Sequence, residues 1–238
     1  PCRADMHSLT TQAILGRLTG GWTPFEGVEE MVPGTMMELT QTGETTHTWF
    51  DLLRDLEVGR IIEAGRVPFD QQVAEFQGHF ARSVELHLLS DAPLATMCSG
   101  GLDSSLVAAV ARDINPDIVA YVAEAEWYRI NEADKAERVC RHLGIELRRV
   151  PMGRSDYLGL WAKAAFHNDQ PIFFPSNPLA LGVNQAASAD GFKVLLNGEG
   201  SDELFGGYRW AVAASRMWRR RRLHARWVPN VRPLRILG

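Results

Sequence analysis

Residues 92–112, APLATMCSGGLDSSLVAAVAR, decide the fold of this chain. An apolar run at residues 92–98 is followed by a glycine-containing loop, and apolar residues then recur at helical spacing over residues 106–112. The apolar run predicts a buried strand, and the later spacing predicts a helix. The stretch therefore predicts one strand, loop and helix unit of an α/β domain.

The same alternation continues along the chain and is preceded by a long amphipathic pattern at residues 69–89. Strands that alternate with helices of this length predict a doubly wound α/β domain with a mainly parallel sheet and helices on both faces. The other predicted elements are strands at residues 118–125, 146–150 and 193–196, helices at residues 132–143, 156–167 and 179–188, and a proline-rich loop at residues 170–178.

The predicted topology indicates where a ligand would bind. Doubly wound sheets hold ligands at the carboxyl ends of their strands, where the winding direction switches. The loops after Cys98 and Leu196 both lie at such ends. Upstream, residues 20–50 carry turn signals at residues 32–34 and 41–43, which predict a short β-rich segment that ends in a linker.

The composition limits the class of protein. A chain of 238 residues with 45% hydrophobic residues can form one large domain, or one domain with a piece of another. It has no apolar run of about 18 residues and no signal-peptide pattern at its start, so we expect a cytoplasmic protein. Cys2, Cys98 and Cys140 lie far apart, which argues against a disulfide scaffold or a structural zinc site. We expect Cys98 to be a small buried side chain.

The charge is distributed unevenly. Residues 216–238 contain eight arginines and no acid, which leaves 17 basic against 29 acidic residues in the rest of the chain. Such an end can bind nucleic acid, a membrane surface or an anionic substrate. Trp210, Trp218 and Trp227 favour amphipathic helix faces instead, so we expect no membrane partner and regard nucleic acid as the weaker alternative.

The glycine loop SGGLDSS, residues 99–105, has the chemistry of a phosphate site. Glycines let the backbone approach a phosphate closely, and the amides at a helix start favour an anion. No lysine follows the glycines, so this is not the loop of kinases and GTPases. Asp103 stands where a cation would be expected, so a divalent metal is the predicted bridge to the phosphates. An ordinary strand-to-helix turn is the structural alternative.

A second motif, KVLLNGEGSDELFGGY, occupies residues 193–208. Glu199, Asp202 and Glu203 place three acids within five positions, where they repel one another unless a cation or a proton intervenes. The structural alternative is the start of a helix, with Ser201 or Asp202 as its cap.

The SGGxDS loop resembles the signature of the ATP pyrophosphatases, whose fold is of the adenine nucleotide alpha hydrolase type. Together with the second motif, it resembles the synthetase domain of the glutamine-dependent asparagine synthetases and their relatives, which include β-lactam synthetases and the macrolactam-forming cyclases of lasso peptides. The resemblance covers residues 64–208 and includes Asn131-Glu132. Residues 23–49 resemble the end of a glutaminase-like domain. The implied division is residues 1–55 for that remnant with its linker, and residues 56–238 for a synthetase domain that is incomplete at its carboxyl end.

The resemblance implies an ATP-dependent amide-forming ligase that uses ATP and Mg²⁺. A carboxylate, from aspartate or a related acid, would attack the α-phosphate and give an acyl-adenylate and pyrophosphate. Ammonia or an amine would then form the amide. Residues matching the ATP-binding positions of the family are Met97, Ser99, Gly100, Gly101, Asp103, Ser104, Val122 and Gly198.

The acids of both motifs also match positions in the family. Glu199 matches its catalytic glutamate, and Asp202 also falls at a catalytic position. Asp103 and Asp202 match the magnesium ligands, and Glu203 would bind substrate or support the loop.

The proline-rich loop departs from the family pattern. Relatives carry DEPxxDPS, whereas residues 169–176 read DQPIFFPS, so Gln170 and Phe174 replace acids. If this loop lines the acceptor site, its wall becomes partly apolar and favours a larger or less polar acid. Alternatively, Phe173 and Phe174 pack in the core.

Both ends of the chain also depart from the family. The glutaminase part is nearly absent, and Cys2 lies behind Pro1 in an unrelated context, so we do not assign it as a nucleophile. The catalytic lysine of the family has no match here. We expect glutaminase and carboxyl-terminal segments in the same or a partner chain, and a homodimer is a further expectation. The alternatives are a β-lactam or macrolactam synthetase, a tRNA-modifying ATP pyrophosphatase and an inactive remnant.

Overall fold

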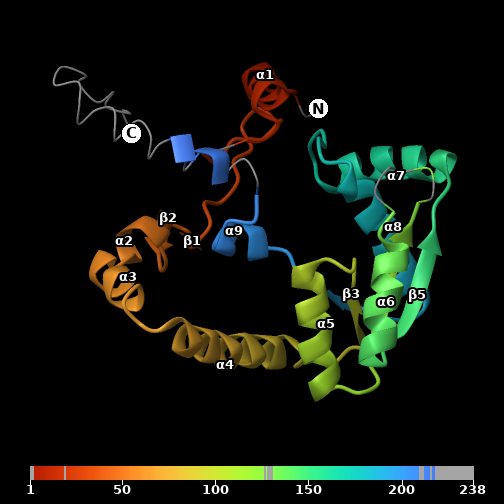
Figure 1. Cartoon of the computed structure of the whole chain (residues 1–238). Coiled ribbons are helices and arrows are strands. Elements are labelled where there is room, and N and C mark those ends of the chain that lie inside the picture. Colours follow the sequence, from red (N-terminus) through yellow and green to blue (C-terminus); the bar gives the residue numbers. More distant parts are fainter. Residues whose placement is uncertain are drawn as a thin grey trace.

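The computed structural model describes residues 3–18, 20–125, 127, 131–208, 212–214 and 216–217 (Figure 1). Cys2 and the arginines after Arg216 lie outside the described residues, as do Trp210, Trp218 and Trp227. The predictions about those residues therefore stay predictions.

The amino-terminal segment combines one helix with a β-hairpin. Helix α1 (Met6–Leu15) begins after Asp5, whose carboxylate accepts a hydrogen bond from the Ser8 amide. Strands β1 (Thr35–Thr40) and β2 (Gly43–Thr48) pair antiparallel across a two-residue turn. The predicted β structure is present, whereas the sequence pattern does not predict α1.

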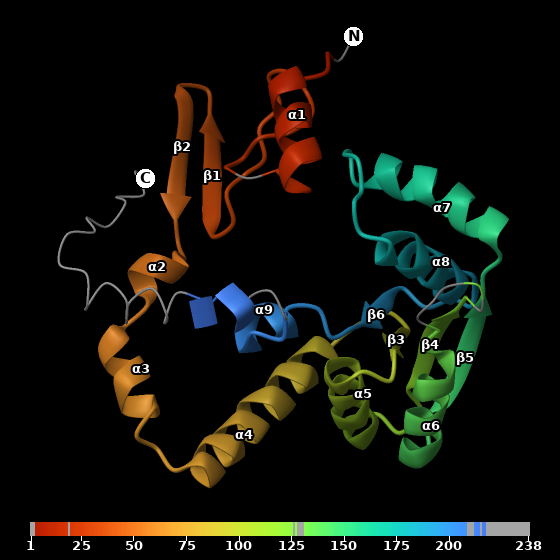
Figure 2. The same ribbon diagram turned by 45° about the horizontal axis from the view of Figure 1, so that its top comes forward.

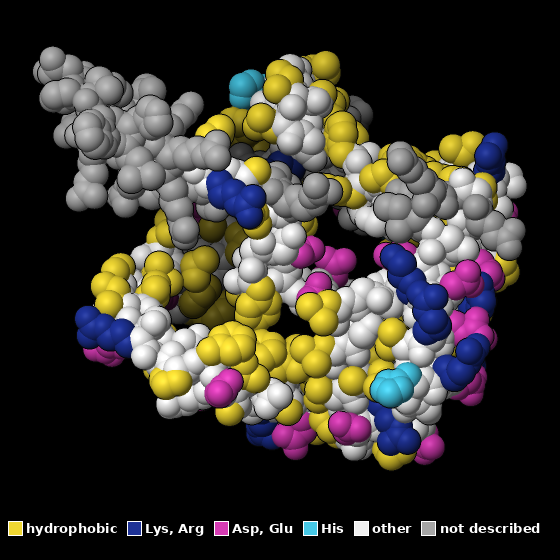
Figure 3. Space-filling model, viewed as in Figure 1, with side chains coloured by type: hydrophobic (Ala, Val, Ile, Leu, Met, Phe, Trp, Pro, Cys, Tyr) yellow, Lys and Arg dark blue, Asp and Glu magenta, His cyan; other side chains and the backbone are white. Residues whose placement is uncertain are grey.

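Three helices connect the hairpin to the sheet: α2 (Leu52–Asp55), α3 (Val58–Ala64) and α4 (Phe69–His87). Helix α4 agrees with the long helix predicted at residues 69–89, and its buried Val84 packs with Ala111 and Ile118. Many apolar side chains of α3 and α4 are exposed, and they form much of the yellow surface at the lower part of Figure 3. In the part of the chain that the structure describes, no helix has the length and apolar character needed to cross a membrane.

The sheet has four strands, all parallel, in the order β5-β4-β3-β6. These strands are β3 (Leu94–Met97), β4 (Val119–Glu124), β5 (Glu146–Pro151) and β6 (Val194–Leu196). All four strands lie where the sequence predicts them.

Helices cover both faces of the sheet, as Figures 1 and 2 show. Alternate side chains of β4 point to opposite faces: Ala120 and Val122 pack in a cluster with residues of α5 and α6, whereas Val119 and Tyr121 pack with residues of α7 and α8. This arrangement confirms the predicted doubly wound α/β fold. The helices of the domain are α5 (Leu102–Ile114), α6 (Ala133–Leu143), α7 (Arg154–His167), α8 (Ser176–Ala189) and α9 (Ser201–Phe205).

The strand order places a switch point between β3 and β6. The chain runs outward from β3 through β4 to β5, and it then returns to place β6 on the other side of β3. Because both strands are parallel, the loops after Met97 and Leu196 leave the same edge of the sheet side by side. The two sequence motifs therefore meet at one place.

Candidate active site

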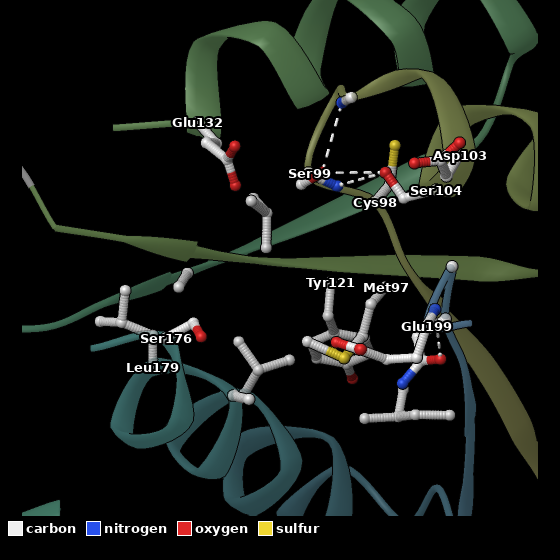
Figure 4. Close-up of a pocket in the computed structure, with 18 of the residues that line it drawn as sticks. Met97, Cys98, Ser99, Asp103, Ser104, Tyr121, Glu132, Ser176, Leu179 and Glu199 are labelled. Carbon is white, nitrogen blue, oxygen red and sulfur yellow. Dashed lines mark hydrogen bonds between the residues drawn. The ribbon is translucent and has the colours of Figure 1, made fainter. Parts of the chain in front are cut away.

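The loop after β3 is held by its own serines. The Ser99 and Ser104 hydroxyls lie 2.9 Å apart, and the Ser99 amide donates to the Ser104 hydroxyl over 3.1 Å. The Gly101 amide donates to the Ser99 hydroxyl over 3.2 Å (Figure 4). These bonds fix a compact turn before a ligand arrives, and α5 begins directly behind it with Gly101 as its cap.

Gly100 allows this turn to pack closely against α6. Its φ of 73° lies in the left-handed region that favours glycine. A Cβ atom at this position would stand 2.6 Å from the backbone of Lys135 and Ala136, at the start of α6. Gly100 therefore allows the loop to lie against α6, and it is the one predicted ATP-binding residue that does not line the cavity described below.

The loop after β6 leads into the short helix α9. Its cap is Gly200, at a φ of 91°, and Asp202 and Glu203 lie in the first turn. The Glu199 amide donates to the Asn197 side chain over 3.1 Å. The predicted helix start is therefore present, but the expectation that Ser201 or Asp202 caps it is wrong because the left-handed turn at Gly200 ends the loop one residue earlier.

The two loops touch through Gly198. A Cβ atom on this residue would come within 2.9 Å of the Ser104 amide nitrogen, so only a glycine leaves room for the neighbouring loop. This contact brings the acids of both motifs to one site.

A cavity of about 390 Å³ lies where the two loops meet. Figure 4 shows the glycine loop with Asp103 and Ser104 on one side of the cavity, and Ser176 and Leu179 of α8 on the opposite side. The sequence-predicted residues that line it are Met97, Ser99, Gly101, Asp103, Ser104, Val122, Gly198, Glu199, Asp202 and Glu203.

Sequence reasoning missed the wall that α8 supplies. Leu179 and Val183 are one helical turn apart and both line the cavity, together with Ser176, Ala180 and Asn184. The four-residue spacing of the two apolar side chains was readable in the sequence, but that spacing alone predicts only a buried helix face. Tyr121 and Ala123 of β4 also contribute to the lining.

Every charged residue that the described chain contributes to the cavity is acidic: Asp103, Glu132, Glu199, Asp202 and Glu203. Glu132 was not assigned a role from the sequence. Its burial raises the pKa of its carboxyl group, and the charge of Lys135 opposes that rise. So many carboxylates around one cavity favour a cationic ligand or a metal ion.

The acids fit a magnesium ion that arrives with a phosphate ligand. Asp103 and Asp202 come from the two touching loops and line the same cavity. Among the described residues, no group of three acidic, cysteine or histidine side chains could hold a metal by itself. Proteins usually bind Mg²⁺ through one or two carboxylates together with substrate phosphates, and Asp103 and Asp202 could supply two such ligands.

Tyr208 orients one of the acids. Its hydroxyl donates to a Glu203 carboxylate oxygen, which lowers the pKa of Glu203 and raises the pKa of Tyr208 to about 12. Glu203 is therefore held as a carboxylate at the cavity. On the sheet side, Cys98 is fully buried, as predicted for a small core side chain.

Residues 169–175 of the proline-rich loop do not line the cavity. Phe173 and Phe174 are 44% and 62% exposed, and neither lines the cavity. The expectation that they pack in the core is therefore wrong. In this part of the chain, the first residue that lines the cavity is Ser176, which follows Pro175 at the start of α8.

Several known proteins are similar to this chain in sequence. A family model described as asparagine synthase matches residues 75–235. The glutamine-hydrolyzing asparagine synthetase 1 of Bacillus subtilis is 34% identical over 140 residues, which are 58% of this chain and 22% of that protein. Asparagine synthetase B of Escherichia coli is 31% identical over 141 residues, covering 53% of this chain and 25% of that protein.

A fungal relative matches over a longer stretch. The amidase chyE of Penicillium rubens is 26% identical over 203 residues, which are 78% of this chain and 30% of that protein. The chain thus spans less than a third of the length of each of these three relatives. Because the family model covers more than half of the chain, this chain belongs to the asparagine synthase family.

Proposed function

We propose that this chain contains the adenylating site of an ATP-dependent amide-forming ligase. The observation that carries the proposal is the contact of Gly198 with the Asp103 and Ser104 backbone, which brings both acid-bearing loops onto one cavity. A site that joins ATP to a carboxylate needs a phosphate cradle next to a place for the acid, and the two loops supply one each.

The nucleotide would lie along the carboxyl end of β3 and β4. The apolar side chains of Met97 and Val122 would contact the base, together with the backbone of Gly198. Amides and hydroxyls of Ser99, Gly101 and Ser104 would bind the β- and γ-phosphates, which leave together as pyrophosphate. Asp103 and Asp202 would hold Mg²⁺, which when bound neutralises charge on that leaving group.

In the first step, an oxygen of the substrate carboxylate would attack the α-phosphorus of ATP. The bond from that phosphorus to the bridging oxygen breaks, and the electron pair leaves with pyrophosphate. The cavity residues contribute by holding the two reactants in line and by stabilising the charge that develops on the leaving oxygens.

In the second step, an amine or ammonia would attack the acyl carbon, and AMP would leave. The nitrogen must lose a proton as the amide forms. Glu199 lines the cavity between the two loops, and its carboxylate could orient the nucleophile or accept that proton. Glu203, kept ionised by Tyr208, would bind a polar or cationic part of the substrate.

The acid and the amine are the open part of this proposal. We take aspartate as the acid and ammonia as the nitrogen source for the first pair of substrates to be tested. An apolar acceptor wall at Phe173 and Phe174 would mildly favour the lactam alternative, but both side chains lie outside the cavity. We therefore take separate acid and amine substrates as the proposed function, with a lactam-forming substrate as an outcome to be tested.

Pyrophosphate exchange tests the first step without requiring the second. The protein is incubated with ATP, Mg²⁺, labelled pyrophosphate and one carboxylic acid at a time, including aspartate, larger acids and β-amino acids that could close a lactam. We expect acid-dependent exchange. Asp103→Asn and Asp202→Asn should each lower it by at least about tenfold, whereas the control Asp117→Asn, at an exposed position that does not line the cavity, should not.

Glu199→Gln separates the two steps. It should keep most of the exchange and lose amide formation when an amine is supplied. Absence of exchange with every acid, in protein shown by circular dichroism to be folded, would reject the adenylating function. Exchange that Asp103→Asn leaves unchanged would reject the assigned site.

A further inference from the structure

The buried amide of Gln12 joins the amino-terminal helix to the loop between α7 and α8. Its side chain on α1 is almost fully buried, and its Nε2 atom donates to the Gln170 side-chain oxygen over 3.0 Å and to the Pro171 carbonyl over 2.9 Å. Both amide hydrogens are therefore used across a sequence separation of more than 150 residues. Figure 2 shows α1 beside this loop.

The loop that Gln12 holds is constrained at both of its ends. At its start, Asp169 adopts a φ of 51°, in the left-handed region, and the Gln170 amide donates to the Ala165 carbonyl of α7. At its end, the Tyr157 hydroxyl donates to the Pro175 carbonyl over 3.0 Å. Gln12 adds bonds to the Gln170 side chain and the Pro171 carbonyl, between the Asp169 turn and Pro175.

The end of the loop determines where α8 begins. Pro175 precedes Ser176 directly, and Ser176, Leu179 and Ala180 of the first turns of α8 line the cavity. A shift of the loop therefore moves the cavity wall that lies opposite the glycine loop in Figure 4.

The side chain of residue 12 must be a hydrogen-bond donor. The two partners of its side chain are acceptor oxygens, so a carboxylate in this place would face them without a proton to share. The remaining Gln12 Oε1 atom is buried and has no hydrogen-bond partner among the described residues. A buried polar atom without a partner costs free energy, so the side chain stays there at a cost that its two donated bonds offset.

We propose that Gln12 is a positioning residue for the substrate cavity: by holding the loop before α8, it fixes the α8 wall and thereby the affinity of the cavity for the substrate that contacts this wall. The inference rests on the proposed adenylating function for its kinetic consequence. Its structural part, the dependence of the loop and the first turns of α8 on Gln12, is independent of that function.

The kinetic test compares variants of similar size. Gln12→Met keeps the length of the side chain and removes its donors, and Gln12→Glu keeps the shape and reverses the hydrogen-bonding character. The control Gln77→Glu makes the same change at an exposed position on α4. We expect both Gln12 variants to raise the KM for ATP or for the acid by about three- to tenfold in the exchange reaction, with kcat within about twofold of the original.

A purely structural role gives a different result. It would lower the melting temperature and the active fraction, but it would leave both KM values unchanged. That outcome in Gln12→Met would overturn the proposal. Gln170→Ala, which removes one of the two acceptors, should give a smaller rise in KM than Gln12→Met.

Hydrogen exchange tests the structural part even if no acid supports pyrophosphate exchange. In Gln12→Met, amides of residues 168–180 should exchange at least about threefold faster, with the amides of α6 unchanged as the internal reference. Unchanged exchange at residues 168–180 would overturn the inference whatever the fate of the proposed function.

Discussion

Gly198 lies so close to the loop of Asp103 that a Cβ atom on residue 198 would stand 3.1 Å from the Asp103 Cβ. The two loops that bear the acids are thus in backbone contact, with no side chain between them. The distance between the two loops therefore depends on residue 198 having no side chain.

Gly198→Ala should therefore separate the loops and lower activity. A displacement of about 1 Å at a reacting centre can cost about a hundredfold in rate, so we expect acid-dependent exchange to fall by roughly ten- to a hundredfold. Gly159→Ala, on α7 with open space around it, is the control and should keep full activity. Equal activity of Gly198→Ala and the original protein would show that the loop contact is not needed.

Gly100→Ala should mainly lower the stability of the folded protein. The left-handed backbone disfavours alanine by about 1–2 kcal/mol, and the added Cβ would press on the backbone of α6. We expect a loss of about 2–5 kcal/mol in the free energy of unfolding, measured by urea denaturation. Gly78→Ala, on the exposed face of α4, should instead stabilise by about 0.5–1 kcal/mol.

Tyr208→Phe should raise the pKa of Glu203 toward its usual value, because it removes the hydrogen bond that favours the carboxylate. In the original protein this bond stabilises the fold above the ordinary glutamate pKa, and the stabilisation is lost as the pH falls through the lowered value. The variant should therefore differ most from the original near neutral pH and least in acid. Carbon NMR titration of labelled glutamate carboxyls measures the shift, and an unchanged Glu203 pKa would contradict the assignment.

Glu132→Gln should change the stability in the opposite direction, and again most at high pH. Burial raises the pKa of Glu132, so its ionised form destabilises the folded state as the pH rises through that raised value. Replacing it by a neutral amide should raise the melting temperature at pH 8 relative to the original protein. At pH 4 the two proteins should melt alike. A stability difference that is constant over this range would show that Glu132 does not carry the expected shift.

The sheet and most of its helices were predictable because their residues follow the period of the element they form. The start of α5, at Leu102, was not predictable in this way. Asp103, Ser104 and Ser105 were expected in the loop, but short polar residues also suit the first turn of a helix, where free amides need acceptors. Helix α8 likewise begins at Ser176 rather than at residue 179, because Pro178 is tolerated in a first turn.

Helix α1 could not be found from hydrophobic periodicity because it buries polar side chains and exposes apolar ones. Its buried residues are the polar Ser8 and Gln12, whereas Met6, Ile14 and Leu15 are 60% to 76% exposed. The position of Gln12 depends on a loop more than 150 residues away, and no local pattern encodes such a contact. For the same reason the α8 wall of the cavity was missed, although the acids on the two loops were correctly expected to lie together.

The carboxylates around the cavity have a consequence for the form in which a nucleotide can enter. Every charged side chain that the described residues contribute to the lining is negative, so a bare nucleotide anion meets a repulsive field. A nucleotide that carries its own cation brings the compensating charge with it. The protein would then discriminate between the two forms by long-range repulsion of the uncompensated one, before any coordination bond is made.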